Sequence, residues 1–470
     1  MNSDTPSAPP TVDSTRLARL GLTLSEWFER WFPDAFALAL LATLVVFVAS
    51  AWVDGSVLRS ARWFGQGYWD LAVFTGQMAM IIVTGYALAS APVVFRVIER
   101  MAAVPRDGRV AIAFVALFSM LSSLLSWSFS LVFSALLARE VARRVKGMDY
   151  RALAAAAYLG VGSVWALGLS SSAALIMASP SSMPASVRSV SGVLPLTMTL
   201  GLWQSWLIAF VLVGISVAIA YLSAPSGPLA RSATDMGVTL EAPRTRAHVV
   251  RRPGEWLEHS PLLTVVVSAM GIAYLVGEVR TSGWLALLGL NTFIFAFGIA
   301  ALLLHWRPRS FVDSVGAAVP SVGGVLIQYP IYAGVIRMMT ESGLSEKLAQ
   351  AFVNVSTAHT FPVFIGVYSA ALGLFVPSAG GKWLIEAPYV LTAAKSLQVH
   401  LGWVVQTYNA TEALANLIHP FWMLPVLGIL GLKARDIIGY CMLQFVVHVP
   451  VVLFLVWALN YTLSYVPTTP

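Results

Sequence analysis

Long apolar stretches recur along the whole chain and are separated by short loops. A helix needs roughly 20 apolar residues to cross the hydrocarbon core of a bilayer. Of the 470 residues, 58% are hydrophobic and only 11% are charged, whereas soluble domains carry roughly 25% charged residues. We therefore predict an all-α polytopic membrane protein with about 11–12 transmembrane helices. The candidate spans are residues 34–53, 69–95, 109–126, 152–168, 202–222, 261–278, 285–305, 314–338, 361–376, 402–418, 421–432 and 437–459.

The few charged and special residues exclude several classes of function. Most basic residues lie in short loops, so the net charge of +7 does not predict nucleic-acid binding. The one cysteine, Cys441, excludes an internal disulfide framework and a cysteine-based metal site. The sequence has no Walker loop, no dinucleotide-binding glycine pattern and no HExxH motif. We expect no enzyme activity, no cofactor and no bound metal. If the chain is a transporter, the lack of a nucleotide site predicts that an ion or substrate gradient drives it.

The distribution of Lys and Arg predicts the orientation of the chain. Several loops carry clusters of basic residues, which the positive-inside rule places in the cytoplasm. The C-terminal segment 460–470 has no basic residue. We therefore expect a cytoplasmic N-terminus and a C-terminus on the opposite side. The basic loops lie at 96–109, 139–151, 223–260, 307–309 and 433–435.

With this orientation, the two halves of the chain cross the membrane in opposite directions. One extra helix, 261–278, lies between them and reverses the direction. This arrangement is typical of two inverted-topology repeats. We predict four regions. They are a polar tail with an interfacial amphipathic helix at 1–33, a first repeat at 34–222, a cytoplasmic loop and linking helix at 223–284, and a second, inverted repeat at 285–470.

A polar break between two apolar stretches is the main pointer to function. Residues Pro377 to Trp383 contain Pro, Ser, two Gly and a Lys. Irregular backbone at membrane depth is tolerated only where protein buries it or where it lines a polar cavity. Discontinuous helices of this kind form the substrate and ion sites of secondary transporters. Apolar pieces too short to cross alone predict re-entrant hairpins, at 128–138, 171–179 and 384–396.

Lys382 and Glu386 are four residues apart, so a helix that starts near Gly381 places both on one face. Lys382 is then suited to attract a small carboxylate, and Glu386 to tune or compete for its charge. Ser378, Gly380 and Gly381 complete the predicted substrate site, because backbone N–H donors at the start of a half-helix favour anions. An alternative is an internal ion pair that only locks the broken helix.

Polar residues also interrupt a late apolar stretch around Glu412 and Asn416. A carboxylate among amides at membrane depth is suited to carry a coupling proton or to help ligate Na⁺. The alternative is a carboxylate that hydrogen-bonds a helix N-terminus.

The first half contains counterparts to these breaks. Serine hydroxyls and freed carbonyls can coordinate Na⁺ or bind a carboxylate, although serines also pack between membrane helices. Trp127 and Trp383 fall within two of the breaks and are predicted to form a pocket wall against an apolar tail. Ser128 is predicted to bind substrate. Four further serines are predicted to handle the coupling ion or line the pocket: Ser126, Ser130, Ser171 and Ser172.

Several motifs together resemble those of the bacterial short-chain fatty acid transporter family. The likeness extends from Trp31-Phe32-Pro33-Asp34 to the span that ends near Leu459. Its motifs are Gln77 to Gly85, Arg139 to Arg144, Val376-Pro377-Ser378 with Gly380-Gly381 and Trp383, Glu412 with Asn416, Pro420-Phe421-Trp422, and Arg435 to Cys441.

The resemblance implies uptake of short-chain monocarboxylates such as butyrate or acetoacetate across the inner membrane, by symport with H⁺ or Na⁺. It also implies a wider group of ion-coupled organic-anion carriers, with inverted repeats, paired re-entrant hairpins and a homodimeric elevator mechanism. The C-terminus is then periplasmic. The chain departs from the family pattern at Ala379, where relatives carry Gly, and at Lys382 and Glu386, where they carry His and Gln.

These departures leave alternatives open. If Lys382 and Glu386 change the substrate preference, the chain carries a different carboxylate or a zwitterion. An uncoupled facilitator or channel for the same anions is a further alternative. An intramembrane enzyme or sensor ranks last, because the longest loop, 223–260, is too short for a signalling domain.

Overall fold

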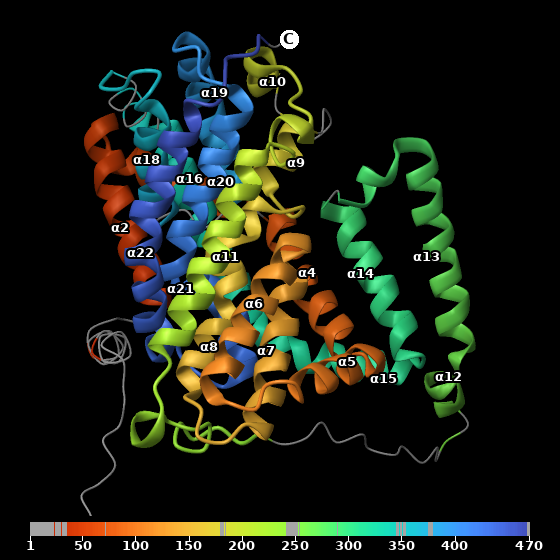
Figure 1. Cartoon of the computed structure of the whole chain (residues 1–470). Coiled ribbons are helices and arrows are strands. Elements are labelled where there is room, and N and C mark those ends of the chain that lie inside the picture. Colours follow the sequence, from red (N-terminus) through yellow and green to blue (C-terminus); the bar gives the residue numbers. More distant parts are fainter. Residues whose placement is uncertain are drawn as a thin grey trace, which may run out of the picture.

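The computed structural model is built entirely of helices in the part of the chain that it describes (Figure 1). Among the described residues, five helices are long and apolar enough to cross a membrane, three bent pairs pass the same test together, and three shorter apolar helices accompany them. The predicted all-α polytopic class is therefore confirmed. The tail and interfacial helix predicted at 1–33 lie almost wholly outside the described residues. Those are 23, 30, 35–70, 72–178, 183, 185–240, 252, 254–288, 290–344, 347, 350, 354–374 and 379–467.

The first half contains a helical hairpin followed by a broken helix. The hairpin partners α6 and α7 pack along each other. Ser126 separates them, because its backbone is extended. Its Oγ accepts a hydrogen bond from the amide of Phe129 and so caps the start of α7. The elements are α2 (Ala35–Asp54), α3 (Val57–Gly67), α4 (Ala72–Ser90), α5 (Pro92–Ala102), α6 (Gly108–Leu125), α7 (Trp127–Arg144), α8 (Tyr150–Leu159), a π turn η1 (Gly160–Val164), a 3₁₀ turn η2 (Trp165–Leu167), α9 (Ser172–Ala178), α10 (Ala185–Ser191), η3 (Leu196–Met198) and α11 (Trp203–Ser223).

The second half contains a similar succession of broken helices. Its elements, with those that link the halves, are η4 (Gly227–Leu229), α12 (Glu255–His259), α13 (Pro261–Ser282), η5 (Trp284–Leu288), α14 (Leu290–His305), α15 (Pro308–Ala318), η6 (Val319–Ser321), α16 (Gly323–Glu341), α18 (Phe361–Gly373), α19 (Ala379–Ser396), α20 (Leu401–Ile418), α21 (Pro420–Leu430) and α22 (Ala434–Asn460).

Prolines mark two of the bends. Pro92 begins α5 after a 69° bend, and Pro420 begins α21 after a 55° bend. Proline lacks a backbone N–H and fits the first turn of a helix, where that donor has no helical partner. The sequence analysis treats 402–418 and 421–432 as separate spans, whereas the structure makes them the two halves of one bent pair.

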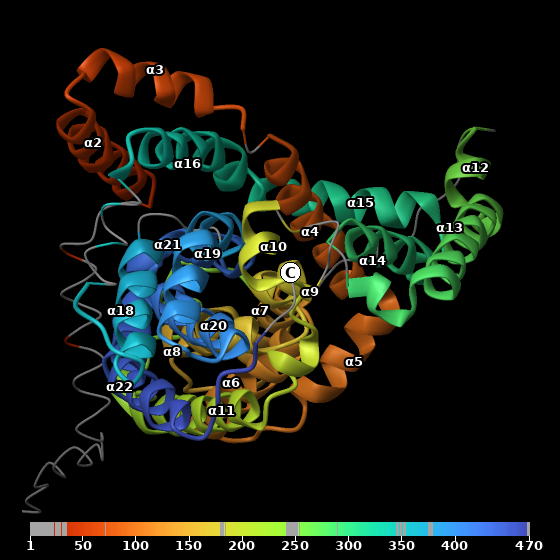
Figure 2. The same cartoon turned by 90° about the horizontal axis from the view of Figure 1, so that it is seen from above.

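A central bundle and a peripheral arm make up the molecule. In Figures 1 and 2, α18 to α22 lie together with α6, α7, α8 and α11. The arm is formed by α13 and α14, which pair with each other, and α14 packs against α4. On another side of the bundle, α16 packs against α2 and α3. The sites described below lie in the central bundle.

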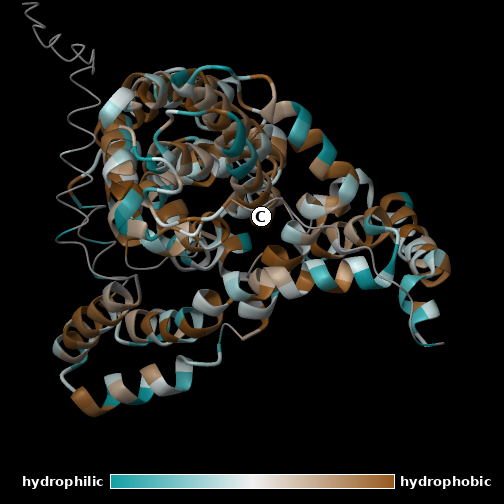
Figure 3. Ribbon diagram, turned by 90° about the horizontal axis from the view of Figure 1, so that it is seen from below, coloured by the Kyte–Doolittle hydropathy of each residue, from teal (hydrophilic) through white to brown (hydrophobic). Residues whose placement is uncertain are grey.

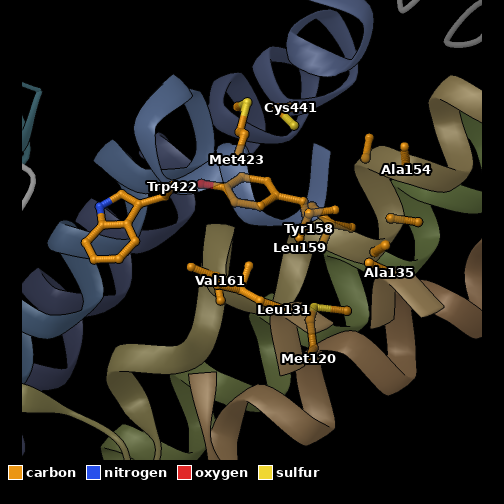
Figure 4. Close-up of a cluster of buried hydrophobic side chains, with 14 of the residues drawn as sticks. Met120, Leu131, Ala135, Ala154, Tyr158, Leu159, Val161, Trp422, Met423 and Cys441 are labelled. Atoms are coloured by element: carbon orange, nitrogen blue, oxygen red, sulfur yellow. The ribbon is translucent and has the colours of Figure 1, made fainter. Parts of the chain in front are cut away.

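Apolar side chains fill the bundle and also cover its outside. Figure 4 shows Met120, Tyr158 and Trp422 in one core, to which α6, α8 and α21 contribute. On the outside, Met270 and Leu262 of α13 are 68% and 57% exposed, as lipid contact requires. Seen from below, apolar residues run along many of the helices (Figure 3).

The connections that carry most basic residues lie at one end of the molecule. In Figure 1 the connections after α5, α7 and α11 lie at the lower end, and the C-terminus lies at the upper end. The basic loops and the C-terminal segment, which has no basic residue, thus lie at opposite ends of the molecule (Figure 1). The predicted orientation depends on this difference between them.

Candidate functional site

Helix starts from opposite halves of the chain lie together at the predicted substrate site. Gly380 faces α9, because a Cβ added there would lie 3.4 Å from the Cβ of Ser172. The hydroxyl of Ser171 accepts a hydrogen bond from the amide of Ala174 (3.3 Å) and so caps the start of α9. Ser378, the predicted hydroxyl of the site, lies outside the described residues.

Lys382 lies in the first turn of α19 with its whole side chain buried. Its ammonium group pairs with the carboxylate of Glu412 from α20. It also donates a hydrogen bond to the backbone carbonyl of Ser369 in α18 (2.6 Å). The predicted pair with Glu386 is present at 3.8 Å between Nζ and Oε1, which is an ion-pair distance but too long for a hydrogen bond. Lys382 therefore joins three helices.

Glu386 and Glu412 are both fully buried. The hydroxyl of Ser369 donates a hydrogen bond to Oε2 of Glu386 (2.5 Å). Within the described part of the chain, Oε1 of each glutamate has no hydrogen-bond partner. We call Lys382, Glu386 and Glu412 the charge cluster.

The charge cluster contains one ammonium group and two carboxylates. When all three are ionised, one negative charge is left uncompensated. An uncompensated charge in a low-dielectric interior is costly unless a counter-ion or proton neutralises it. The cluster is therefore chemically suited to take up a cation, and its ammonium group is suited to bind an anion that displaces a carboxylate.

One aromatic ring covers the ammonium group, and a second packs against the first. Nζ of Lys382 lies 4.7 Å from the ring centroid of Tyr408, close enough for a cation–π contact. The Tyr408 hydroxyl donates a hydrogen bond to the carbonyl of Ala379 (2.5 Å). The ring of Trp383 lies 4.7 Å from that of Tyr408. Trp383 is thus close to the charge cluster, and its predicted contact with an apolar tail stays a prediction.

Asn416 lies one helical turn after Glu412 on α20 and is buried. Neither atom of its side-chain amide has a hydrogen-bond partner among the described residues. Its backbone carbonyl accepts a hydrogen bond from the Tyr158 hydroxyl of α8. Asn416 therefore holds an unused donor and an unused acceptor inside the bundle.

The serines around the tip of the first hairpin make local hydrogen bonds. Ser126 caps α7, and its hydroxyl lies 3.2 Å from that of Ser128. The hydroxyl of Ser130 donates to the carbonyl of Ser119 (2.7 Å). These bonds stay within the first half, and the placement of the three serines at the substrate or ion site stays a prediction.

Trp127 lies in a cluster with two other tryptophans. Its ring centroid lies 6.3 Å from that of Trp165 in η2 and 5.6 Å from that of Trp422 in α21. Trp165 and Trp422 lie 6.5 Å apart. We call Trp127, Trp165 and Trp422 the tryptophan cluster.

The sequence analysis misses three residues of the site. Tyr408 is four residues before Glu412, a spacing that places both on one face of α20. Gly373 allows close packing, because a Cβ there would lie 3.2 Å from Oε2 of Glu412 and 3.3 Å from Nζ of Lys382. Ser369 carries no signal in the sequence, since a single serine in an apolar helix is common between membrane helices.

Replacing Gly373 by Val should impair the charge cluster directly. The first added carbon would lie 2.8 Å from the Cβ of Ala415, so α18 must move away from α20. Overpacking of this kind lowers the free energy of unfolding by about 1–3 kcal/mol. We expect the initial rate of uptake of labelled butyrate, the substrate implied by the family resemblance, to fall about tenfold or more. Gly214→Val is the matched control, because a Cβ at Gly214 in α11 meets nothing within 4 Å. Equal uptake by the two variants would contradict the placement of Gly373 in the site.

Nearly the whole chain matches a known family. A family model described as short chain fatty acid transporter matches residues 16–459. A protein of Escherichia coli K12, named as a candidate short-chain fatty acid transporter, is 36% identical over 428 residues, which cover 90% of this chain and 96% of that protein. A Haemophilus influenzae protein with the same name is 32% identical over 443 residues, 93% of this chain and 98% of that protein.

Two solved structures are also similar to this chain. The Alcanivorax borkumensis YdaH transporter, described as having an unusual topology, is 17% identical with a TM-score of 0.48, and the match covers 93% of this chain and 100% of that one. The Neisseria gonorrhoeae MtrF structure, described as an antimetabolite efflux pump, is 13% identical with a TM-score of 0.42, and the match covers 96% of this chain and 98% of that one.

Proposed function

The chain belongs to the short-chain fatty acid transporter family, and from this premise we propose that it carries small monocarboxylates such as butyrate or acetoacetate by secondary active transport. As a member of a transporter family, it is not an enzyme. The observation that carries the proposal is the charge cluster, where a buried ammonium group meets two buried carboxylates at the start of a half-helix.

Substrate binding is proposed to occur by exchange of ion pairs. The ammonium group of Lys382 is held by Glu412 in this structure. A monocarboxylate carries the same charge and the same acceptor atoms as Glu412, so it can take that place on Lys382. The backbone at Gly380 and Gly381, at the start of α19, would complete the anion site. The ring of Trp383 is proposed to contact the acyl chain.

The coupling ion is proposed to neutralise the glutamate that the substrate displaces. A bound monocarboxylate leaves the site with three carboxylates and one ammonium group. Transport of such an excess of negative charge through a low-dielectric interior is costly. One H⁺ or Na⁺ taken up at Glu412 or Glu386, with Asn416 as a nearby polar partner, reduces that cost. Bound substrate is therefore expected to raise the affinity for the cation, and bound cation to raise the affinity for the substrate.

The mechanism is proposed to use two inverted repeats, at 34–222 and 285–470, in an elevator-like movement across the bacterial inner membrane. The order of elements supports this proposal, because α6–α7, α8–α9 and α11 have counterparts in α18–α19, α20–α21 and α22. The gathering of basic connections at one end supports a cytoplasmic N-terminus and a periplasmic C-terminus (Figure 1).

The excess carboxylate in the charge cluster favours one other cargo. A zwitterion brings its own ammonium group, which can pair with the uncompensated glutamate while its carboxylate binds Lys382. A zwitterionic substrate adds no net charge, so the loaded site would keep the single uncompensated charge of the empty charge cluster and would need one coupling cation fewer than a site loaded with a monocarboxylate.

Competition for uptake distinguishes these cargoes. Purified protein in proteoliposomes should take up labelled butyrate faster than protein-free liposomes, which report passive diffusion of butyric acid. Unlabelled acetoacetate and propionate should compete, whereas succinate and glycine should not. Competition by glycine but not by acetoacetate would favour the zwitterion, and butyrate uptake equal to that of protein-free liposomes would contradict the proposed substrate class.

A further inference from the structure

The tryptophan cluster forms where three interruptions of helical structure meet. Trp127 is the first residue of α7, directly after the break at Ser126. Trp165 begins the 3₁₀ turn η2, directly after the π turn η1. Trp422 lies in the first turn of α21, after the bend at Pro420. π turns and broken helices occur often at functional sites.

The cluster contains buried hydrogen-bond donors that are not used. Trp165 is 3% exposed and Trp422 is 7% exposed. Neither indole N–H has a hydrogen-bond partner among the residues that the structure describes. An indole N–H can only donate, so no rearrangement of its proton removes the deficit. Each buried donor without a partner is costly, and the presence of two within one ring cluster calls for an acceptor.

Packing around the cluster makes its position definite. A Cβ at Gly160 or at Gly168 would collide with the backbone of α6, at Ser119 and Leu124 respectively. Glycines at these positions hold the segment that carries Trp165 directly against α6. The Trp165 donor therefore belongs to a tightly packed element rather than to a loosely held loop.

The required ligand has an acceptor for the N–H groups and an apolar portion for the rings. Trp127 is only partly buried, whereas Lys382 is fully buried. A small molecule can therefore contact the tryptophan cluster at the ring of Trp127. A short-chain monocarboxylate supplies both the carboxylate oxygens and the small apolar tail.

We propose that Trp165 and Trp422 form a second monocarboxylate site, in which their indole N–H groups bind the carboxylate and the ring of Trp127 contacts the acyl chain. The inference rests on the proposed function, because it takes the same substrate class. The inference gives the tryptophan cluster a different role from the charge cluster. The tryptophan cluster, which carries no formal charge, binds the substrate before the substrate reaches Lys382. It therefore affects apparent affinity and not the coupling to a cation.

Substitution of the indoles by phenyl rings tests the site, because Phe keeps an apolar ring and removes the donor. Trp165→Phe, Trp422→Phe and the double variant are reconstituted, and initial uptake of labelled butyrate is measured against its concentration. Each single change should raise the KM for butyrate about tenfold, since a hydrogen bond to a charged acceptor is lost. The ratio of accumulated to external butyrate at steady state should stay at the wild-type value.

Trp403→Phe is the matched control. Trp403 is a fully buried tryptophan of α20, but its indole N–H already donates to the carbonyl of Val456 (3.2 Å). Its replacement should lower thermal stability and leave the KM unchanged. Because Trp165 and Trp422 lie in separate elements, one variant still tests the site if the other does not fold.

A second readout separates failure of this inference from failure of the proposed function. Butyrate should raise the melting temperature of the wild-type protein in detergent, and the double variant should lose this shift. If the wild-type protein takes up butyrate and both tryptophan variants have the same KM as the wild type, only the second site is overturned. A wild-type protein that neither transports butyrate nor is stabilised by it would overturn both proposals.

Discussion

Lys382→Met is expected to abolish concentrative uptake and to destabilise the protein by about 3–5 kcal/mol, the usual cost of removing one partner of a buried ion pair. The methionine keeps the apolar stem of the side chain and removes the ammonium group. Glu386 and Glu412 then lie fully buried with no cation between them. The measurements are thermal unfolding in detergent and uptake of labelled butyrate into proteoliposomes.

The double variant Lys382→Met/Glu412→Gln separates the effect on stability from the effect on transport. It removes both ends of the pair, so most of the lost stability should return. Uptake should remain absent, because the substrate carboxylate has no ammonium group to bind. Normal stability and normal uptake in Lys382→Met alone would contradict the account of the charge cluster, and restored uptake in the double variant would contradict the role of Lys382 as the substrate-binding group.

Asp149→Ala is expected to have the largest effect on stability outside the site. The carboxylate of Asp149 is fully buried and lies 2.8 Å from a guanidinium nitrogen of Arg151, which is itself 2% exposed. It also accepts hydrogen bonds from the amides of Ala152 (2.9 Å) and Arg231 (3.1 Å). The substitution removes the carboxylate from a buried guanidinium group, and we expect a loss of about 3–5 kcal/mol.

Asp107→Ala provides the matched control. Asp107 caps α6 as Asp149 caps α8, by accepting hydrogen bonds from two backbone amides, but it is exposed. Loss of a cap alone costs about 1 kcal/mol. The melting temperature should therefore fall much further in Asp149→Ala than in Asp107→Ala. Similar decreases would show that the buried ion pair adds nothing to the cap.

The interruptions of the helices were predictable because they depend on local chemistry. Proline, glycine and serine disfavour helix interiors whatever surrounds them, so the bend before Pro420 can be found in the sequence. Of the break predicted at 377–383, residues 377 and 378 lie outside the described residues, and α19 already begins at Ala379. The contact between Lys382 and Glu386 follows from the same local geometry, since residues four apart share one face of a helix. The family was also predictable, because its motifs extend over most of the chain.

The partners that define the site depend on tertiary packing and were not predictable. The sequence places Glu412 in a separate coupling role, whereas the structure pairs it with Lys382 across two helices. Ser369 bonds both Lys382 and Glu386, yet one serine in an apolar helix gives no signal. Trp165 lies in a stretch predicted as a regular span, and only the π turn before it reveals the interruption.

Gradient-driven accumulation of labelled butyrate tests the central claim most directly. Wild-type and Lys382→Met proteoliposomes are compared with an inward H⁺ gradient or an inward Na⁺ gradient imposed in turn, with protein-free liposomes under each gradient to subtract passive diffusion of butyric acid. Cation-coupled transport predicts that one gradient drives butyrate above its external concentration in the wild type and not in Lys382→Met. Equilibration of butyrate without accumulation under either gradient would contradict coupling and favour a facilitator.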